Sequence, residues 1–345
     1  MLNPTQAKRL VALCRGKSPW LILSHNHPDP DSLACAWALQ FILAEKAQVA
    51  SKIVYGGIMG REENRLMNNL LKIGAIRLRL SHFLKYKYVA LMDTQPGAGN
   101  NSLPPEIKPL VVIDHHPPLP ASLEVEFRYI ENDCGATATI MVELIQALGV
   151  EPPPLLSTAL YYSLISETQH LGRDVTQRDI DAAIFLFPRA KHRLISQIQH
   201  PHRNREFFQQ LYIALEKAFT YKSVVAATLG TIHHPGFVAQ LADILISLQR
   251  SAWCFVSGRY RDTLYLSLRT TRPKARAGRL LRAVIGKLGS AGGHDMMAGG
   301  QIPLKNMSPE EIKTLEDKLL RQFFKEVGMP EDYNPTPLVN LSPPA

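Results

Sequence analysis

The chain has 345 residues, of which 46% are hydrophobic and 20% charged, and its formal net charge at pH 7 is +9. This length favours about two domains, each with a core of its own, and excludes a small fold held together by disulfides. The four cysteines are isolated in the sequence, so we expect reduced, buried thiols rather than disulfides or metal thiolates.

The N-terminal segment lacks the apolar core of a signal peptide, and no apolar run approaches the roughly 18 residues that a membrane helix needs. We therefore expect a soluble cytoplasmic protein without a membrane partner, and leave homodimerisation open. The excess charge is concentrated in residues 251–305, where ten lysines and arginines stand against two acidic residues. Such a stretch is either a solvated basic face or a surface that attracts phosphate groups.

Strand-like apolar runs alternate with helical periods through the first part of the chain. Strands are predicted at 20–25, 52–55, 86–93 and 109–114, and helices at 33–47, 63–74 and 136–149. This alternation predicts a largely parallel sheet covered by helices on both faces, which makes residues 1–200 an α/β domain. The following patterns are helical without a strand, so we expect a helical linker at 201–221.

A second, smaller α/β domain is predicted over residues 222–328. Its expected strands are 221–230, 252–258 and 263–270, and its expected helices are 237–248, 277–289 and 308–327. Residues 329–345 are rich in proline and show no period, so we expect a loosely ordered tail there.

Three ionisable side chains, His25, Asp29 and Asp31, lie at the end of the first predicted strand or just after it. Ligands bind beyond the carboxyl ends of the strands in sheets of this kind. Each residue alone has an ordinary structural explanation, such as a helix cap or a turn. Together they would repel and desolvate one another unless a cation held them.

The next two strand ends supply matching groups. The run 86–93 ends in Asp93, and the run 109–114 is followed by His115 and His116. A set of carboxylates and imidazoles without thiolates is typical of Mn²⁺ or another hard-to-borderline divalent ion. Five or six ligands exceed what one catalytic ion can use, which favours a pair of ions bridged by a carboxylate. We predict Asp93 as the bridge because its strand is central.

These residues resemble the motifs of the DHH phosphoesterase family, which is named after the triplet that is Asp114-His115-His116 here. Residues 25–32 resemble the first motif, LMDTQPG around Asp93 the second, VVIDHHP the third and SETQHLGRD the fourth. The segment GSAGGHDMMAGG, residues 289–300, resembles the glycine-glycine-histidine signature of the DHH-associated C-terminal domain. The resemblance spans about residues 20–305. Within the family, the chain is similar to proteins that combine oligoribonuclease and PAP phosphatase activity.

The resemblance implies two Mn²⁺ ions, with Mg²⁺ or Co²⁺ as substitutes, and a set of metal ligands: His25, Asp29, Asp31, Asp93, His115 and Glu167. Asp93, His115 and His116 are implied as catalytic, with His116 near the phosphate. Glu167 stands where the family usually has an aspartate. We expect the glutamate to bind the metal, although its extra methylene could instead carry it past the ion and weaken that site.

In the second domain, the resemblance implies substrate binding by Arg269, Gly292, Gly293 and His294. Glycine backbone N–H groups, an imidazole and a guanidinium suit a phosphate, so the basic stretch is interpreted as a phosphate-binding surface. The resemblance implies an active site in a cleft between the domains. There, water activated by two metals would hydrolyse short oligonucleotides, linear dinucleotides or nucleoside bisphosphates, as an exonuclease or a phosphatase does. The alternative is a nucleotide-binding sensor whose catalysis is weakened or lost through Glu167.

Overall fold

A computed structural model describes residues 4–293, 295–330 and 334–339. The chain divides into two compact units, with the division after Pro201, and each unit is described by itself. No described helix combines the length and apolarity that crossing a membrane requires. All four cysteines are buried and free.

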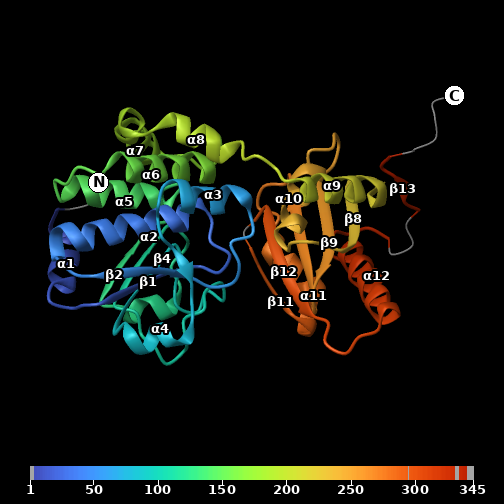
Figure 1. Ribbon diagram of the computed structural model, residues 1–345, viewed down its shortest axis with the longest axis horizontal. Helices are drawn as coiled ribbons and strands as arrows, with labels where there is room; N and C mark the ends of the chain where they lie inside the picture. The colour runs from blue at the N-terminus through green and yellow to red at the C-terminus, as the bar shows by residue number, and fades with distance from the viewer. Residues whose placement is uncertain (1–3, 294, 331–333, 340–345) are drawn as a thin grey trace. The chain divides into compact units, whose positions relative to one another are not determined.

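The first unit contains a sheet of six parallel strands in the order β3-β2-β1-β4-β5-β6 (Figure 1). Its strands are β1 Trp20–Ser24, β2 Ser51–Tyr55, β3 Ile76–Arg77, β4 Tyr88–Met92, β5 Val111–Asp114 and β6 Phe127–Ile130. Its helices are α1 Pro4–Cys14, α2 Pro30–Ile42, η1 Leu43–Ala47, α3 Glu62–Leu70, α4 Leu80–Lys85, η2 Pro120–Glu124, α5 Thr137–Ala147, α6 Pro154–Glu167, α7 Gln177–Leu186, η3 Phe187–Arg189 and α8 His192–Gln199. The predicted α/β fold with a parallel sheet is therefore confirmed.

Both faces of this sheet are buried, as continuous apolar runs such as that of β1 require. Alternate strand residues enter different cores: Trp20 and Ile22 pack in the larger cluster, and Leu21 and Leu23 in a smaller one. The larger core is covered by α1, α2, α5 and α6, whereas α4 lies on the other face, where its Phe83 packs (Figure 1). The helical cover is thus unequal. The sequence pattern did not reveal β3, which has two exposed residues, or β6, which is only partly buried.

The second unit contains a mixed sheet of seven strands in the order β11-β12-β10-β9-β8-β7-β13, in which only β8 and β9 pair in parallel among the described residues. Its elements are α9 Arg205–Lys217, β7 Phe219–Tyr221, β8 Val224–Thr231, α10 Gly236–Leu245, β9 Trp253–Tyr260, β10 Thr263–Thr270, α11 Ala277–Ile285, η4 Gly286–Leu288, β11 Ser290–Gly293, β12 Met297–Pro303, α12 Pro309–Glu326 and β13 Thr336–Pro337. The predicted second α/β domain is confirmed, with more strands than the sequence indicated.

Two parts of this unit differ from simple expectation. Helix α9 lies in the range 201–221 that was predicted as a linker, and its Phe207 and Ala214 belong to the core of the second unit. In the proline-rich segment, β13 pairs with β7 instead of lying loose. Proline is tolerated there because β13 is an edge strand.

Candidate metal centre

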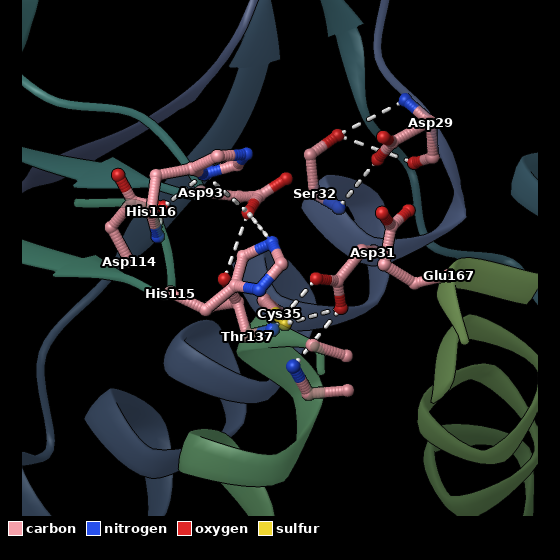
Figure 2. Close-up of polar contacts among 12 residues, drawn as sticks. Asp29, Asp31, Ser32, Cys35, Asp93, Asp114, His115, His116, Thr137 and Glu167 are labelled. Carbon is pink, nitrogen blue, oxygen red and sulfur yellow. Dashed lines mark hydrogen bonds and ion pairs between the residues drawn. The ribbon is translucent and has the colours of Figure 1, made fainter. Parts of the chain in front are cut away.

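The predicted ligands of the first unit gather at the carboxyl edge of its parallel sheet, and Figure 2 shows five of them: Asp29, Asp31, Asp93, His115 and Glu167. His25 follows β1, Asp93 follows β4, and His115 follows β5. Because these three strands are neighbours and parallel, their carboxyl ends meet at one edge. Topology therefore brings together groups that are up to 90 residues apart in the sequence.

Asp93 lies at the centre of this set. Its Oδ2 is 3.6 Å from Nε2 of His25, and its Oδ1 is 3.8 Å from Nε2 of His115 and from Nδ1 of His116. Among the described residues, two groups of three could hold a metal ion, namely Asp93 with His115 and His116, and Asp93 with His25 and Asp29. Asp93 is common to both groups, which is the arrangement that a bridging carboxylate requires.

The conformation of Asp93 is unusual. Its φ is +57°, in the left-handed region that few residues other than glycine adopt. Its N–H donates to Ile113 O at 2.9 Å, and its Oδ1 accepts a hydrogen bond from Oγ1 of Thr137 at 2.8 Å. Aspartate tolerates this region better than most residues do, and these two contacts hold Asp93 there.

The electrostatics of Asp93 favour a bound cation. Burial raises the pKa of Asp93 well above its usual range, and the negative charges of Asp31 and Asp29 raise it further. An isolated buried cluster of carboxylates opposes its own ionisation. A divalent ion between these groups would remove that penalty.

His25 supplies an independent test of whether a metal fits. Its Nδ1 is 2.9 Å from Asn26 O, but its buried Nε2 has no hydrogen-bond partner in the structure. That atom lies 3.3 Å from Oδ1 of Asp29, and although burial lowers the pKa of His25, the charge of Asp29 raises it to about 9. A buried imidazole nitrogen that faces two carboxylates has the chemistry of a metal ligand. The residues therefore fit the implied ion.

Asp29 and Asp31 have different surroundings. Asp29 is the N-cap of α2, where its Oδ1 accepts a hydrogen bond from Ser32 N at 2.9 Å. Asp31 is 1% exposed and accepts hydrogen bonds at both oxygens, from Thr137 N at 2.7 Å and Ala138 N at 3.0 Å. Asp31 thus satisfies the first N–H groups of α5 and lies outside the two ligand groups. Its assignment as a ligand stays a prediction.

Glu167 is the last residue of α6, and its side chain is 26% exposed. Burial raises the pKa of Glu167 to about 7, with Asp29 and Asp31 acting in the same direction and Arg173 in the opposite one. Its Oε1 accepts a hydrogen bond from Nη2 of Arg173 at 3.1 Å, and the same nitrogen donates to Glu167 O at 2.8 Å. Figure 2 shows Glu167 beside Asp31 and Asp29. The carboxylate is therefore near the centre but shared with an arginine.

The three residues of the Asp114-His115-His116 triplet have different hydrogen-bond partners. His116 Nδ1 is 2.7 Å from Oδ1 of Asp114, and His115 Nδ1 is 3.4 Å from Cys134 O. Burial lowers the pKa of His116, but its hydrogen bond and charge pairing with Asp114 raise the pKa above the usual value. Gln95 holds Asp114 in turn, because its Nε2 donates to Oδ2 of Asp114 at 2.7 Å. Asp114 is thus a positioning residue for His116 rather than a member of the ligand groups.

A further set of contacts holds the segment that carries Thr137. Asp179, on α7, is fully buried and accepts hydrogen bonds from Gly135 N at 2.9 and 3.0 Å and from Oγ1 of Thr139 at 2.5 Å. It also accepts from the N–H and Oγ1 of Thr176, each at 2.8 Å. These bonds place the N-terminus of α5 against Asp31 and Asp93.

Sequence reasoning missed Gln95, Thr137 and Asp179. Gln95 lies within the LMDTQPG segment quoted as the second motif, and Thr176 and Asp179 form a capping box at the start of α7. Asp179 contacts Gly135, and Thr137 contacts Asp93. The two residues of each pair are 44 positions apart in the sequence. Such pairings follow from the tertiary fold and not from local spacing.

The predicted substrate residues of the second unit lie on β10 and β11. Arg269 is 7% exposed; its Nε donates to Oδ1 of Asp243 at 2.5 Å and its Nη1 to Oγ of Ser267 at 2.8 Å. Gly292 and Gly293 belong to β11, which pairs with β12. His294 lies outside the described residues.

Gly293 has a packing reason to be glycine. Its φ is +147°, and a Cβ there would lie 2.3 Å from Met297 O. At Gly292, by contrast, a Cβ would meet nothing within 4 Å. The role of these glycines and of Arg269 in substrate binding stays a prediction, as does the position of the active site between the two domains.

Comparison with protein families and known structures agrees with this arrangement. Residues 19–169 match the model described as DHH family, N-terminal domain, and residues 221–326 match the DHHA1 domain. An uncharacterized protein of Methanocaldococcus jannaschii is 31% identical over 323 residues, which are 92% of this chain and 66% of that protein. A probable manganese-dependent inorganic pyrophosphatase of Enterococcus faecalis is 24% identical over 164 residues, or 47% of this chain and 53% of the relative.

The crystal structure of an exopolyphosphatase-related protein from Bacteroides fragilis superimposes with a TM-score of 0.70 at 14% identity. The match covers 94% of this chain and 98% of that one. At this identity, the likeness concerns the fold alone. The chain spans about two thirds of the length of the archaeal relative and about half that of the pyrophosphatase.

Proposed function

Since the chain belongs to the DHH family and carries a C-terminal DHHA1 domain, we propose that it is a metal-dependent hydrolase of phosphate esters. The observation that carries the proposal is the sharing of Asp93 by two groups of potential ligands. The buried Nε2 of His25, which faces the carboxylates of Asp29 and Asp93 at 3.3 and 3.6 Å, supports it. We propose two ions, one held by Asp93 with His25 and Asp29, and the other by Asp93 with His115.

Divalent ions held by these residues would supply positive charge to stabilise the phosphoryl oxygens and to activate water. Mn²⁺ is the proposed ion, because the donors are mixed carboxylate and imidazole and because the pyrophosphatase relative is described as manganese-dependent. Mg²⁺ and Co²⁺ are the expected substitutes. Asp31 and Glu167 complete the proposed ligand set.

The protein's own groups are proposed to orient the reaction. Thr137 holds one oxygen of Asp93, which keeps the carboxylate in place between the two ligand groups. Asp114 binds Nδ1 of His116, so the proton that His116 exchanges with a substrate oxygen would be carried on Nε2. Asp114 favours the protonated form of His116, which is the form that can donate a proton to a leaving oxygen.

The proposed substrates are short oligonucleotides, linear dinucleotides and nucleoside bisphosphates. The basic stretch 251–305 supports phosphate recognition by the second unit, with Arg269, Gly292, Gly293 and His294 as the proposed contacts. A cytoplasmic location fits the four buried, free thiols.

The test is a product assay with Mn²⁺ against a panel of bisphosphates and di- to pentanucleotides, beside chelator-treated protein. Turnover of at least one class, lost on chelation and restored by Mn²⁺, is expected. Full turnover in chelator would contradict the proposal.

The hydrogen bond between Arg173 and Glu167 supports one alternative, a nucleotide-binding sensor. If Arg173 keeps Glu167 from a second ion, the site would bind nucleotide and turn it over poorly. Tight binding without turnover at saturating Mn²⁺ would favour the sensor.

A further inference from the structure

Besides the basic stretch of the second unit, the first unit has a group of basic side chains. They surround a hollow beside the edge strand β3. The hollow has a volume of about 570 Å³ and is lined by Ile76, Arg77, Leu78, Arg79 and His82. Arg77 and Arg79 are exposed, so their guanidinium groups can reach a ligand from solvent. The proposed reaction makes no use of these residues.

Several cations gather around His82 at this hollow. The charged groups that act on His82 are Arg79, Lys52 and Lys85, all cations, and Arg77 is a further one on the lining. Clustered cations raise the local concentration of anions. Two arginines favour phosphate in particular, because the planar guanidinium forms two parallel hydrogen bonds with it.

The strand register relates this hollow to the metal centre. Arg77 pairs with Tyr55, Tyr55 with Ser24, and Ser24 with Met92, so these residues form one row across four strands. Ser24 and Met92 directly precede the ligands His25 and Asp93. Neighbouring strands lie about 4.8 Å apart, so Arg77 is about 10 Å from the β1 end of this row and about 14 Å from the β4 end.

We propose that Arg77 and Arg79 bind the phosphodiester backbone of a single-stranded oligonucleotide, a few nucleotides from the bond that lies at the metal centre. This inference rests on the proposed function and names a substrate class for it. A chain of about five nucleotides is long enough to occupy both places, whereas a nucleoside bisphosphate is too short. The hollow therefore adds affinity for oligonucleotides alone.

An anionic lipid surface is the competing ligand. Leu80 and Leu84 on α4 are 80% and 89% exposed, and exposed leucines beside cations suit a membrane interface. The position of Arg77 in the same row as the residues before the metal ligands favours the substrate instead. Binding to a lipid surface does not require that the basic residues lie in the same row as the residues before the metal ligands.

The test compares Arg77→Glu/Arg79→Glu with the matched control Lys87→Glu/Lys108→Glu. The control makes the same charge change at two exposed lysines near the amino ends of β4 and β5. These lysines therefore lie at the end of the strands opposite to the metal centre. Fluorescence anisotropy with a labelled, non-hydrolysable pentanucleotide in Mn²⁺ and low salt gives Kd, and calorimetry gives Kd for a nucleoside bisphosphate.

We expect the pentanucleotide Kd to rise at least about tenfold in Arg77→Glu/Arg79→Glu, as loss of a charge-assisted contact implies. The control should retain the wild-type Kd, and the bisphosphate Kd should be unchanged in both. If the double variant fails to fold by circular dichroism, Arg77→Gln/Arg79→Gln should show a smaller increase in the same direction.

An unchanged pentanucleotide Kd in the folded variant would overturn the inference, as would an equal loss in the control. Sedimentation with phosphatidylserine vesicles that depends on Arg77 and Arg79, without an effect on oligonucleotide binding, would assign the surface to lipid and also overturn it. Because these binding measurements need no turnover, they test the role of Arg77 and Arg79 separately from the proposed hydrolase function. A protein that hydrolyses nothing but binds the pentanucleotide through Arg77 and Arg79 would refute the proposed function and support this site.

Discussion

Oγ1 of Thr137 donates a hydrogen bond to Oδ1 of Asp93 at 2.8 Å, although the two residues lie on different elements 44 positions apart. The backbone N–H of the same threonine donates to Oδ2 of Asp31. One residue at the start of α5 thus contacts two of the predicted metal-binding carboxylates. The metal centre is consequently sensitive to the position of α5.

The first prediction concerns Thr137 as a positioning residue. Thr137→Val keeps the shape of the side chain but removes its hydroxyl, so Asp93 should lose its orientation while the fold is retained. We expect Mn²⁺ affinity measured by calorimetry to fall about tenfold, since one hydrogen bond to a charged group is worth about 1.5 to 3 kcal/mol. Thr158→Val is the control, because Oγ1 of Thr158 donates to Pro154 O and accepts from Lys191 N, neither of which is a residue of the ligand groups. Equal Mn²⁺ affinities in the two variants would contradict a positioning role.

The second prediction concerns Asp93 as the shared ligand. Asp93→Asn should abolish tight binding of both ions and lower kcat by several orders of magnitude, because both ligand groups contain this carboxylate. Calorimetry should show two bound Mn²⁺ per wild-type chain and no tight site in the variant. Retention of one tight site would show that Asp93 serves one ion only.

The same substitution has a pH-dependent effect on the metal-free protein. The pKa of Asp93 is raised in the folded state, so the folded state resists ionisation that the unfolded chain undergoes freely above about pH 4. The free energy of unfolding of the wild type in chelator should therefore fall as pH rises from 4 towards neutrality, relative to Asp93→Asn. Thermal unfolding at pH 4 and pH 7.5 checks this. In chelator at pH 7.5, this effect makes the wild type the less stable of the two proteins. With Mn²⁺ at pH 7.5 the wild type should be the more stable one, since the ion stabilises only the wild type.

The third prediction concerns Glu167. If it binds the second ion, Glu167→Ala should lower the number of bound Mn²⁺ from two to one and lower kcat with it. Arg173→Ala should then strengthen the second site, because the guanidinium no longer competes for Oε1. Unchanged Mn²⁺ stoichiometry in Glu167→Ala, with improved occupancy in Glu167→Asp, would show instead that the longer side chain does not reach the ion productively.

The fourth prediction concerns the stability of the first unit. Asp179 is fully buried and accepts hydrogen bonds from Gly135, Thr139 and Thr176. Asp179→Asn turns one acceptor oxygen into a donor that faces other donors, so the free energy of unfolding should fall by about 3 kcal/mol. Urea unfolding measures this. As control, Asp181→Asn affects an exposed contact with Gln177 on the same helix and should change stability by less than about 0.5 kcal/mol.

Much of the first unit was predictable because its strands are long apolar runs buried on both faces. Such runs are recognisable locally, and the helices between them keep a regular period. Strand β3 was missed because it has only two residues, both exposed, and β6 was missed because, unlike the fully buried β5 of the same length, it carries the exposed Arg128 and is buried only in part. Strand β11 was missed because serine, alanine and glycine have weak strand preferences, and its position is set by pairing with β12.

The sequence by itself determined most candidate ligands, because a carboxylate or imidazole at the ends of three buried strands, β1, β4 and β5, is visible in the order of residues, whereas Glu167 was implied by the family resemblance. Parallel connection of those strands then implied a shared edge. Only the tertiary structure decided that Asp93 is the member common to both ligand groups, that Asp31 is bound by the N-terminus of α5, and that Glu167 is shared with Arg173. These facts depend on distances between side chains of different elements, which packing sets to a fraction of an ångström and local spacing does not encode.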